Sequence, residues 1–241
     1  MNSPPAPKIT PSPNIWRWPD LYELENRAQD STGALWEALR GHCDWAGRDV
    51  VDIGCGDGFH LEVFAASARS VVGVEPHPPL ARRARERVAG RAGVDVRQAP
   101  AQRLPLADAG ADLVHARTAY FFGPGCEPGL AEAERVLRPG GTLAIIDLDA
   151  ACPPYGDWMR ADAPHYDPVA VESFFQRRGF DSVGVRSEWR FDARAELEAV
   201  LGIEFSPKVA RRAARQVTGC AFEVGYRLRV RRRPVGLLRS R

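Results

Sequence analysis

The sequence predicts an α/β protein in which helices cover both faces of a doubly wound, mostly parallel sheet. From about residue 48 onward, segments typical of strands alternate with segments typical of helices. The strand segments are apolar runs without polar alternation, a pattern that indicates strands buried on both faces. The first of these runs, residues 50–53, leads directly into a glycine-rich turn. Together these observations favour a single sheet whose parallel strands are joined by helices.

The hydrophobic pattern places the individual elements. Strands are expected near residues 49–53, 71–75, 94–98, 111–116 and 141–147, and helices near 59–67, 78–89 and 127–137. After residue 149 the alternation stops. We expect a loop containing Pro153, Pro154, Tyr155 and Trp158, then a helix near 167–178 that Gly179 ends. Two more strand segments, near 180–190 and 219–231, are separated by a helical insertion at 194–216.

The N-terminal region divides into a tail and a helical pair. Residues 1–14 contain five prolines and are expected to be disordered. Residues 16–40 predict two helical pieces, with Pro19 near the first start, Ser31 or Thr32 capping the second, and Gly41 ending it. We expect residues 15–241 to form one domain. Its parts are a helical lid (15–47), a ligand-binding core (48–149) and a substrate-side region (150–241).

Size and composition bound the class of protein. A chain of 241 residues suits one domain with additions, and a formal net charge of +2 does not favour bulk capture of nucleic acid. The five cysteines are scattered, so neither a disulfide framework nor a metal site is expected, and a cytoplasmic protein is predicted. No apolar run approaches the roughly 20 residues that span a bilayer, and no signal region is evident at the N-terminus.

The glycine-rich turn carries the strongest functional signal. Asp52 is followed by Gly54, Gly56 and Gly58 at alternate positions. Glycines allow positive φ angles and let a ligand approach the main chain closely. A second acidic residue, Glu75, ends the next apolar run, where a carboxylate can bind the two hydroxyls of a ribose. This pattern predicts a nucleoside site at the edge of the sheet.

Two details distinguish this site from a dinucleotide site. Phe59 occupies the position of the third glycine in the dinucleotide pattern. The carboxylate of Asp52 repels a pyrophosphate but can hold an ammonium group. The implied ligand has a ribose and an amino-acid end without phosphates, and S-adenosylmethionine fits this description. A nicotinamide-dependent oxidoreductase and a catalytically silent S-adenosylmethionine-binding module are the alternatives.

The chain resembles the class I S-adenosylmethionine-dependent methyltransferases, of the broad small-molecule type called methyltransferase type 11. Five segments match that family's motifs in order, at residues 50–58, 74–76, 98–106, 112–117 and 135–141. The resemblance implies a Rossmann-like, seven-stranded sheet with terminal antiparallel pairing, and S-adenosyl-L-methionine as cofactor. One departure is that Pro100 and Gln102 replace acidic residues usual in the adenine-side loop. Main-chain atoms near Ala101, the Gln102 amide or stacking must then hold the adenine.

The candidate site residues lie at this predicted edge or in the lid. Those expected to bind the cofactor are Tyr22, Asp52, Gly54, Cys55, Gly56, Gly58, Glu75, Pro76, Ala101, Gln102, Ala116 and Arg117. His115 and Asp147, near the ends of the fourth and fifth strands, are the candidate catalytic bases, although a histidine packed within the sheet is the alternative for His115. Aromatic residues are expected around the acceptor, namely Tyr120, Phe121, Phe122, Tyr155 and Trp158.

The sequence therefore predicts methyl transfer to a small molecule, at oxygen in preference to nitrogen or carbon. We expect a monomer or homodimer that contacts no membrane. Seven arginines between Arg227 and Arg241 could touch phosphates, but they are more typical of a solvated edge strand. Nucleic acid is accordingly not the expected partner.

Overall fold

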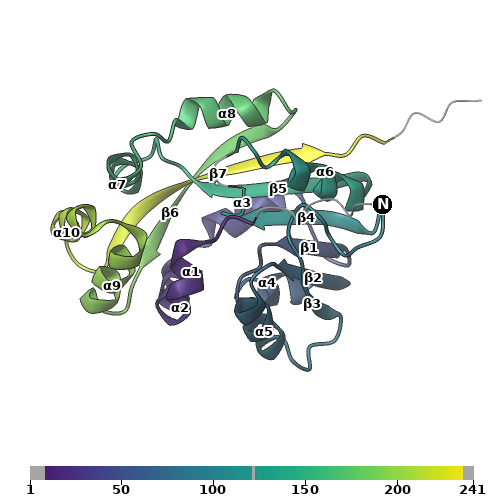
Figure 1. Ribbon diagram of the computed structural model, residues 1–241, viewed down its shortest axis with the longest axis horizontal. Coiled ribbons are helices and arrows are strands. Elements are labelled where there is room, and N and C mark those ends of the chain that lie inside the picture. The colour runs from purple at the N-terminus through teal and green to yellow at the C-terminus, as the bar shows by residue number, and fades with distance from the viewer. Residues whose placement is uncertain (1–8, 121–122, 236–241) are drawn as a thin grey trace, which may run out of the picture.

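The computed structural model describes residues 9–120 and 123–235 and confirms the α/β class (Figure 1). Its strands are β1 (Asp49–Ile53), β2 (Ser70–Glu75), β3 (Val94–Gln98), β4 (Ala111–Arg117), β5 (Leu137–Leu148), β6 (Asp181–Arg190) and β7 (Ala221–Arg232). Its helices are α1 (Pro13–Arg17), α2 (Pro19–Ala28), α3 (Ala34–His42), α4 (Leu61–Ala65), α5 (Pro78–Arg87), α6 (Glu127–Val136), α7 (Tyr155–Asp162), α8 (Pro168–Gln176), α9 (Arg194–Glu204) and α10 (Pro207–Gln216).

The strands form one seven-stranded sheet in the order β3-β2-β1-β4-β5-β7-β6. Strands β1 to β5 pair in parallel. Strand β7 runs antiparallel to both of its neighbours, β5 and β6. This confirms the Rossmann-like, mostly parallel sheet with a terminal antiparallel strand. Because β2 flanks β1 on one side and β4 on the other, the chain crosses over in opposite directions at β1. In such sheets ligands bind beyond the carboxyl ends of the strands at this point.

The core elements lie close to their predicted positions. Strands β1 and β3 have the expected bounds, and β2 and β4 each extend one residue further. Strand β5 begins earlier than expected, because Leu137 already pairs with Ala111 of β4. Three residues after Leu137, the Gly140 amide donates a hydrogen bond to the carbonyl of Arg233, which directly follows β7, at 2.9 Å. The turn before the fifth strand is therefore part of the sheet edge.

The N-terminal region differs from prediction in three respects. Helix α3 is not capped by Ser31 or Thr32. Instead the carboxylate of Asp30 accepts hydrogen bonds from the amides of Leu35 and Trp36, at 3.0 and 3.3 Å. The Asp30 carboxylate also accepts a hydrogen bond from the Ser187 hydroxyl of β6 at 2.5 Å, which ties the helix start to the sheet. Helix α3 then continues through Gly41 to His42. Of the predicted tail, Pro13 and Asn14 belong to α1.

The segment after β5 is more regular than the predicted loop. Tyr155 starts α7, and both Tyr155 and Trp158 are buried against Phe205 and Phe222. The Trp158 indole donates a hydrogen bond to Gln216 at 2.6 Å, which joins α7 to α10. Phe205 and Gln216 belong to the insertion and Phe222 to β7, so the partners lie far along the chain and the local sequence around Tyr155 does not indicate them. The insertion forms two helices, and α9 packs beside α2.

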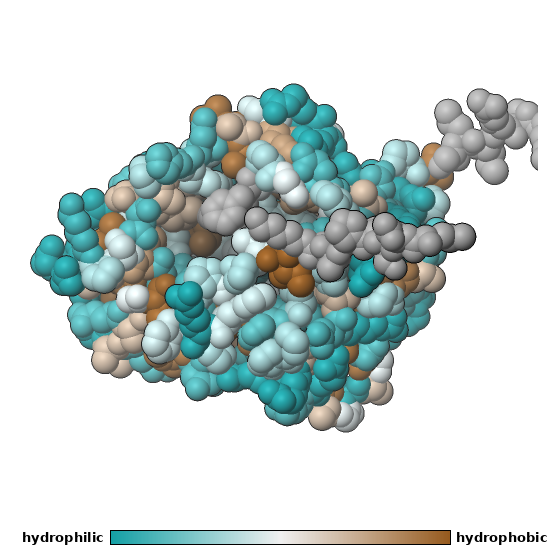
Figure 2. All heavy atoms as spheres, in the orientation of Figure 1, coloured by the Kyte–Doolittle hydropathy of each residue, from teal (hydrophilic) through white to brown (hydrophobic). Residues whose placement is uncertain are grey.

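Figure 2 shows one face of the molecule, where hydrophilic residues predominate and hydrophobic residues form small separate patches. Within residues 9–120 and 123–235, the model contains no helix that combines the length and apolar character needed to cross a bilayer.

Candidate active site

A cavity of about 610 Å³ lies at the carboxyl ends of the parallel strands. Its walls come from the turns after β1, β2, β3 and β4, from the N-terminal segment with α1 and α2, and from α7 and α9. A volume of this size is typical of sites for small organic ligands. Residues Ile9 to Asn14, which the sequence assigned to a disordered tail, also line the cavity.

Ten of the twelve residues expected at the cofactor line this cavity. They are Tyr22, Asp52, Gly54, Cys55, Gly56, Glu75, Pro76, Ala101, Gln102 and Arg117. The other two do not line it. Gly58 has a φ of 85° and packs on α5, where an added Cβ would lie 3.1 Å from Ala84. Ala116 is buried within β4. Both therefore have structural positions behind the cavity.

The glycine turn leaves no space for side chains. Gly54 and Gly56 have φ angles of 73° and 58°, which glycine adopts readily. A Cβ on Gly54 would lie 2.9 Å from the Cβ of Ala119, and one on Gly56 would lie 2.8 Å from the Cδ1 of Ile15. The turn is thus held between the segment after β4 and helix α1, with its main chain at the cavity wall.

Glu75 is the best-placed ligand for a diol. Its Oε2 accepts the Gly56 amide at 3.0 Å, and its Oε1 accepts the His77 amide at 2.9 Å. A carboxylate has about four lone-pair sites, so each oxygen keeps capacity for a ligand hydroxyl. Burial raises the pKa of Glu75 to about 7, although the two amides oppose this shift. The two hydrogen bonds fix the carboxylate at the end of β2.

The two predicted catalytic bases occupy positions outside the cavity lining. His115 is fully buried, and its Nδ1 lies 2.7 Å from Oδ1 of Asp52. It therefore orients the Asp52 carboxylate from behind, consistent with the packed histidine that was the alternative. Asp147 is also fully buried, and its Oδ2 accepts a hydrogen bond from Arg229 at 2.6 Å. Burial raises the pKa of Asp147 to about 6. The geometry offers neither group a direct path to an acceptor.

Comparison with known proteins finds a methyltransferase domain within the chain. Residues 51–145 match the model of a methyltransferase domain. An uncharacterized methyltransferase of Mycobacterium ulcerans is 38% identical over 122 residues, which cover 51% of this chain and 47% of that protein. Residues 51–145 are therefore similar to a methyltransferase domain, in agreement with the resemblance to the class I S-adenosylmethionine-dependent methyltransferases.

Two further comparisons bear on the methyltransferase domain. The 27-O-demethylrifamycin SV methyltransferase of Amycolatopsis mediterranei is 35% identical over 141 residues, covering 56% of this chain and 51% of that protein. The crystal structure of YcgJ from Bacillus subtilis superposes with a TM-score of 0.61 at 16% identity, covering 85% of this chain and all of that chain, so it shares the fold. The first matches span about half the length of the curated relatives.

The described residues fit the methyltransferase cofactor. The glycine turn presents bare main chain, Glu75 has free lone pairs for a ribose, and Asp52 supplies a carboxylate for an ammonium group. Trp16 of α1 stacks on His77 with ring centroids 4.2 Å apart, and the His77 amide donates to Glu75. Of the predicted aromatic wall, Tyr120 and Tyr155 line the cavity, and Phe121 and Phe122 lie outside the described residues.

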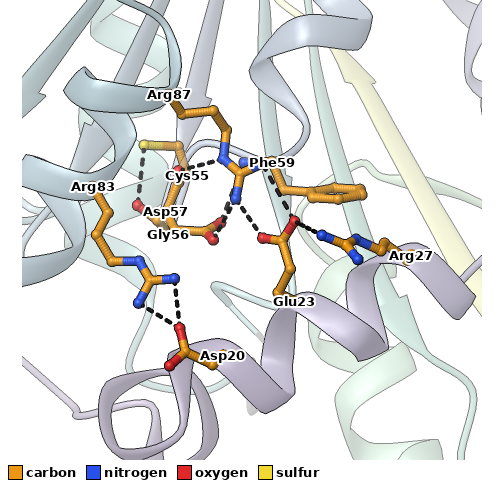
Figure 3. A network of polar contacts seen from close by, with 9 residues as sticks. All are labelled: Asp20, Glu23, Arg27, Cys55, Gly56, Asp57, Phe59, Arg83 and Arg87. Atoms are coloured by element: carbon orange, nitrogen blue, oxygen red, sulfur yellow. Dashed lines mark hydrogen bonds and ion pairs between the residues drawn. The ribbon is translucent and has the colours of Figure 1, made fainter. Parts of the chain in front are cut away.

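Helix α2 of the methyltransferase is fastened to the cofactor side by arginines of α5 (Figure 3). Arg87 donates to the Asp57 carboxylate at 2.9 Å and to the Asp57 carbonyl at 3.1 Å, and it also donates to Glu23 of α2. Arg83 donates to Asp20 through both terminal nitrogens at 2.9 Å. These contacts place α2 along the cavity, as expected for a lid.

Sequence reasoning missed an acidic pair in the cavity lining. Glu25 of α2 and Glu204 of α9 both line the cavity, 179 positions apart in a chain of 241 residues. No motif in the sequence marks either residue. A second missed residue is Thr118, which lines the cavity directly after β4 and has a φ of 52°. Such strain in a residue other than glycine is common at functional sites.

Proposed function

We propose that this protein transfers the methyl group of S-adenosylmethionine to a small-molecule acceptor, at oxygen in preference to nitrogen or carbon. The observation that carries the proposal is the pairing of Asp52 and Glu75 around a glycine turn that has room only for main chain. The carboxylate of Asp52 disfavours a pyrophosphate and suits an ammonium group, and the carboxylate of Glu75 suits a ribose. The relative that methylates 27-O-demethylrifamycin SV supports an oxygen acceptor.

Each wall of the cavity has a proposed task. Asp52, oriented by His115, holds the ammonium of the methionine end, and Glu75 holds the ribose. Ala101 and Gln102 border the adenine, while Tyr22 and Arg117 face the methionine side. Bound S-adenosylmethionine supplies an electrophilic methyl group. The protein then contributes alignment of the acceptor and exclusion of water, which account for much of the rate enhancement in such reactions.

The Glu75→Ala variant tests the cofactor assignment. We expect its affinity for S-adenosylhomocysteine to fall at least about tenfold, because two charge-assisted hydrogen bonds to the ribose are lost. Isothermal titration calorimetry measures this loss, and circular dichroism checks the fold. Glu86→Ala is the matched control, since Glu86 is an exposed carboxylate on the neighbouring helix α5. Equal affinities for Glu75→Ala and the unmodified protein would contradict the ribose assignment.

A silent binding module is the second candidate, and the positions of His115 and Asp147 outside the cavity favour it. A turnover assay distinguishes an active methyltransferase from a silent binding module. An active enzyme accumulates S-adenosylhomocysteine with at least one acceptor in a panel of phenols, alcohols and amines, whereas a silent module accumulates none although it binds the cofactor. We further propose a cytoplasmic monomer or homodimer that binds no nucleic acid, which light scattering and electrophoretic mobility assays test.

A further inference from the structure

A buried and a half-buried carboxylic acid lie close together at the end of the cavity formed by α2, α7 and α9. We call Glu25 and Glu204 the carboxyl pair. Glu25 is only 2% exposed, and helix α2, which carries it, packs against α9, which ends at Glu204. Like charges this close are costly in a buried position, so their juxtaposition requires a compensating group.

The hydrogen bonds of the carboxyl pair are incomplete. Glu204 is satisfied, because the Asn14 amide donates to one of its oxygens and the Tyr155 hydroxyl donates to the other. Glu25 accepts one hydrogen bond, from Gln29 Nε2 to its Oε1 at 2.6 Å. Its buried Oε2 has no hydrogen-bond partner among residues 9–120 and 123–235, and the acid next to the Glu25 carboxyl group is Glu204. A proton or a ligand donor must therefore come between the two carboxylates.

The charges around the pair balance only when it retains a proton. Burial raises the pKa of both acids, and the neighbouring Glu204 raises that of Glu25 further. Arg117 of β4 is a buried cation that acts on Glu25, and it donates to the Gln29 side chain at 2.5 Å. One guanidinium neutralises one carboxylate. The remaining acid stays protonated, or it ionises when a ligand brings a second positive charge.

The surrounding side chains favour a cationic ligand over a neutral one. The rings of Tyr155 and Phe205 contact each other with centroids 5.2 Å apart, and both residues line the cavity beside Glu204. Tyr22 also lines the cavity and lies beside Glu25. Ring faces and carboxylates together recognise ammonium groups through cation–π attraction and charge-assisted hydrogen bonds. A ligand hydroxyl would donate one hydrogen bond but would not supply the positive charge that balances the second carboxylate.

We propose that the carboxyl pair is a subsite for a protonated amino group on the methyl acceptor. The ammonium replaces the shared proton, donates to Glu25 Oε2 and completes the charge balance with Arg117. The substrate class is thereby narrowed to amine-bearing small molecules. This inference rests on the proposed function only in that the acceptor shares the cavity with the cofactor.

Benzylamine and benzyl alcohol are suitable probes, because they share a ring and differ in the ammonium group. Each is titrated into the protein with and without S-adenosylhomocysteine, and binding is measured by saturation-transfer NMR and calorimetry. We expect the protein to prefer benzylamine at least tenfold. The variants Glu204→Gln and Glu25→Gln should reduce this preference to less than threefold. The control Glu198→Gln, an exposed carboxylate on the same helix that pairs with Arg194, should retain it.

Equal binding of the two probes, or a preference retained in both Gln variants with intact melting curves, overturns the proposal. It is also overturned if Glu204→Gln weakens S-adenosylmethionine binding but not S-adenosylhomocysteine binding, since the pair would then hold the sulfonium. Failure of S-adenosylhomocysteine to bind would instead contradict the proposed function. The titrations without it still test the carboxyl pair.

Discussion

At the scale of single residues, Glu75 provides the cavity with a fixed carboxylate, and burying its charge lowers the stability of the folded protein. The carboxylate is held rigidly by two amides, yet its charge is removed from water at the end of β2. Burial is the main cause of its raised pKa, and the charges of Asp52 and Asp57 add to it. Perturbed carboxylates of this kind are concentrated at functional sites.

The pH dependence of the Glu75→Gln variant follows from this shift. The pKa is about 7 in the folded protein and near 4.5 for an unburied glutamate. The cost of burying the charge is thus fully present above pH 7 and is lost as the pH falls toward 4.5. Between pH 5 and pH 8, the unfolding free energy of the variant should shift by about 2–3 kcal/mol in its favour relative to the unmodified protein. Urea denaturation at several pH values measures this difference, and a constant difference would refute the assignment.

At the scale of elements, the sequence predicted the core better than the periphery. Apolar runs and glycines such as Gly54 and Gly56 act locally, so strands β1 to β4 were placed nearly correctly, and the glycine turn lies at the cavity as predicted. The cap of α3 by Asp30 and the burial of Tyr155 in α7 depend on contacts with β6 and the insertion. Glu25 and Glu204 meet only because α2 packs on α9. Local patterns carry no information about such distant contacts.

The attachment of α2 to α5 gives a prediction with an internal control. Arg87→Gln leaves the buried Asp57 without its cation and next to Glu23, which keeps only its ion pair with the exposed Arg27, so we expect a loss of about 2–4 kcal/mol of unfolding free energy. Arg83→Gln removes an equivalent but exposed contact to Asp20 on the same two helices, and should cost less than about 1 kcal/mol. Denaturant unfolding of the two variants measures both values. Similar losses of unfolding free energy in the two variants would show that the burial of Asp57 does not strengthen its ion pair with Arg87.

At the scale of the whole molecule, α2 joins the two ends of the cavity. On one side it is fastened to α5 and the glycine turn, and on the other it packs against α9 and β6. In Figure 1 these partners lie on opposite sides of α2. A ligand that fills the cavity therefore contacts elements from both halves of the sheet, and its binding energy should stabilise the entire fold.

Thermal unfolding with bound ligands provides the corresponding test. S-adenosylhomocysteine at about 100 times its Kd should add about 2.7 kcal/mol to the stability, since it binds only the folded protein. For a domain of this size the melting temperature should rise by roughly 5–10 °C. The rise should be much smaller for Glu75→Ala at the same ligand concentration, because the affinity is lower. NADH should cause no rise, since its pyrophosphate would meet the carboxylate of Asp52 at the glycine turn. Stabilisation by NADH without stabilisation by S-adenosylhomocysteine would instead identify a nicotinamide-dependent enzyme on the same sheet.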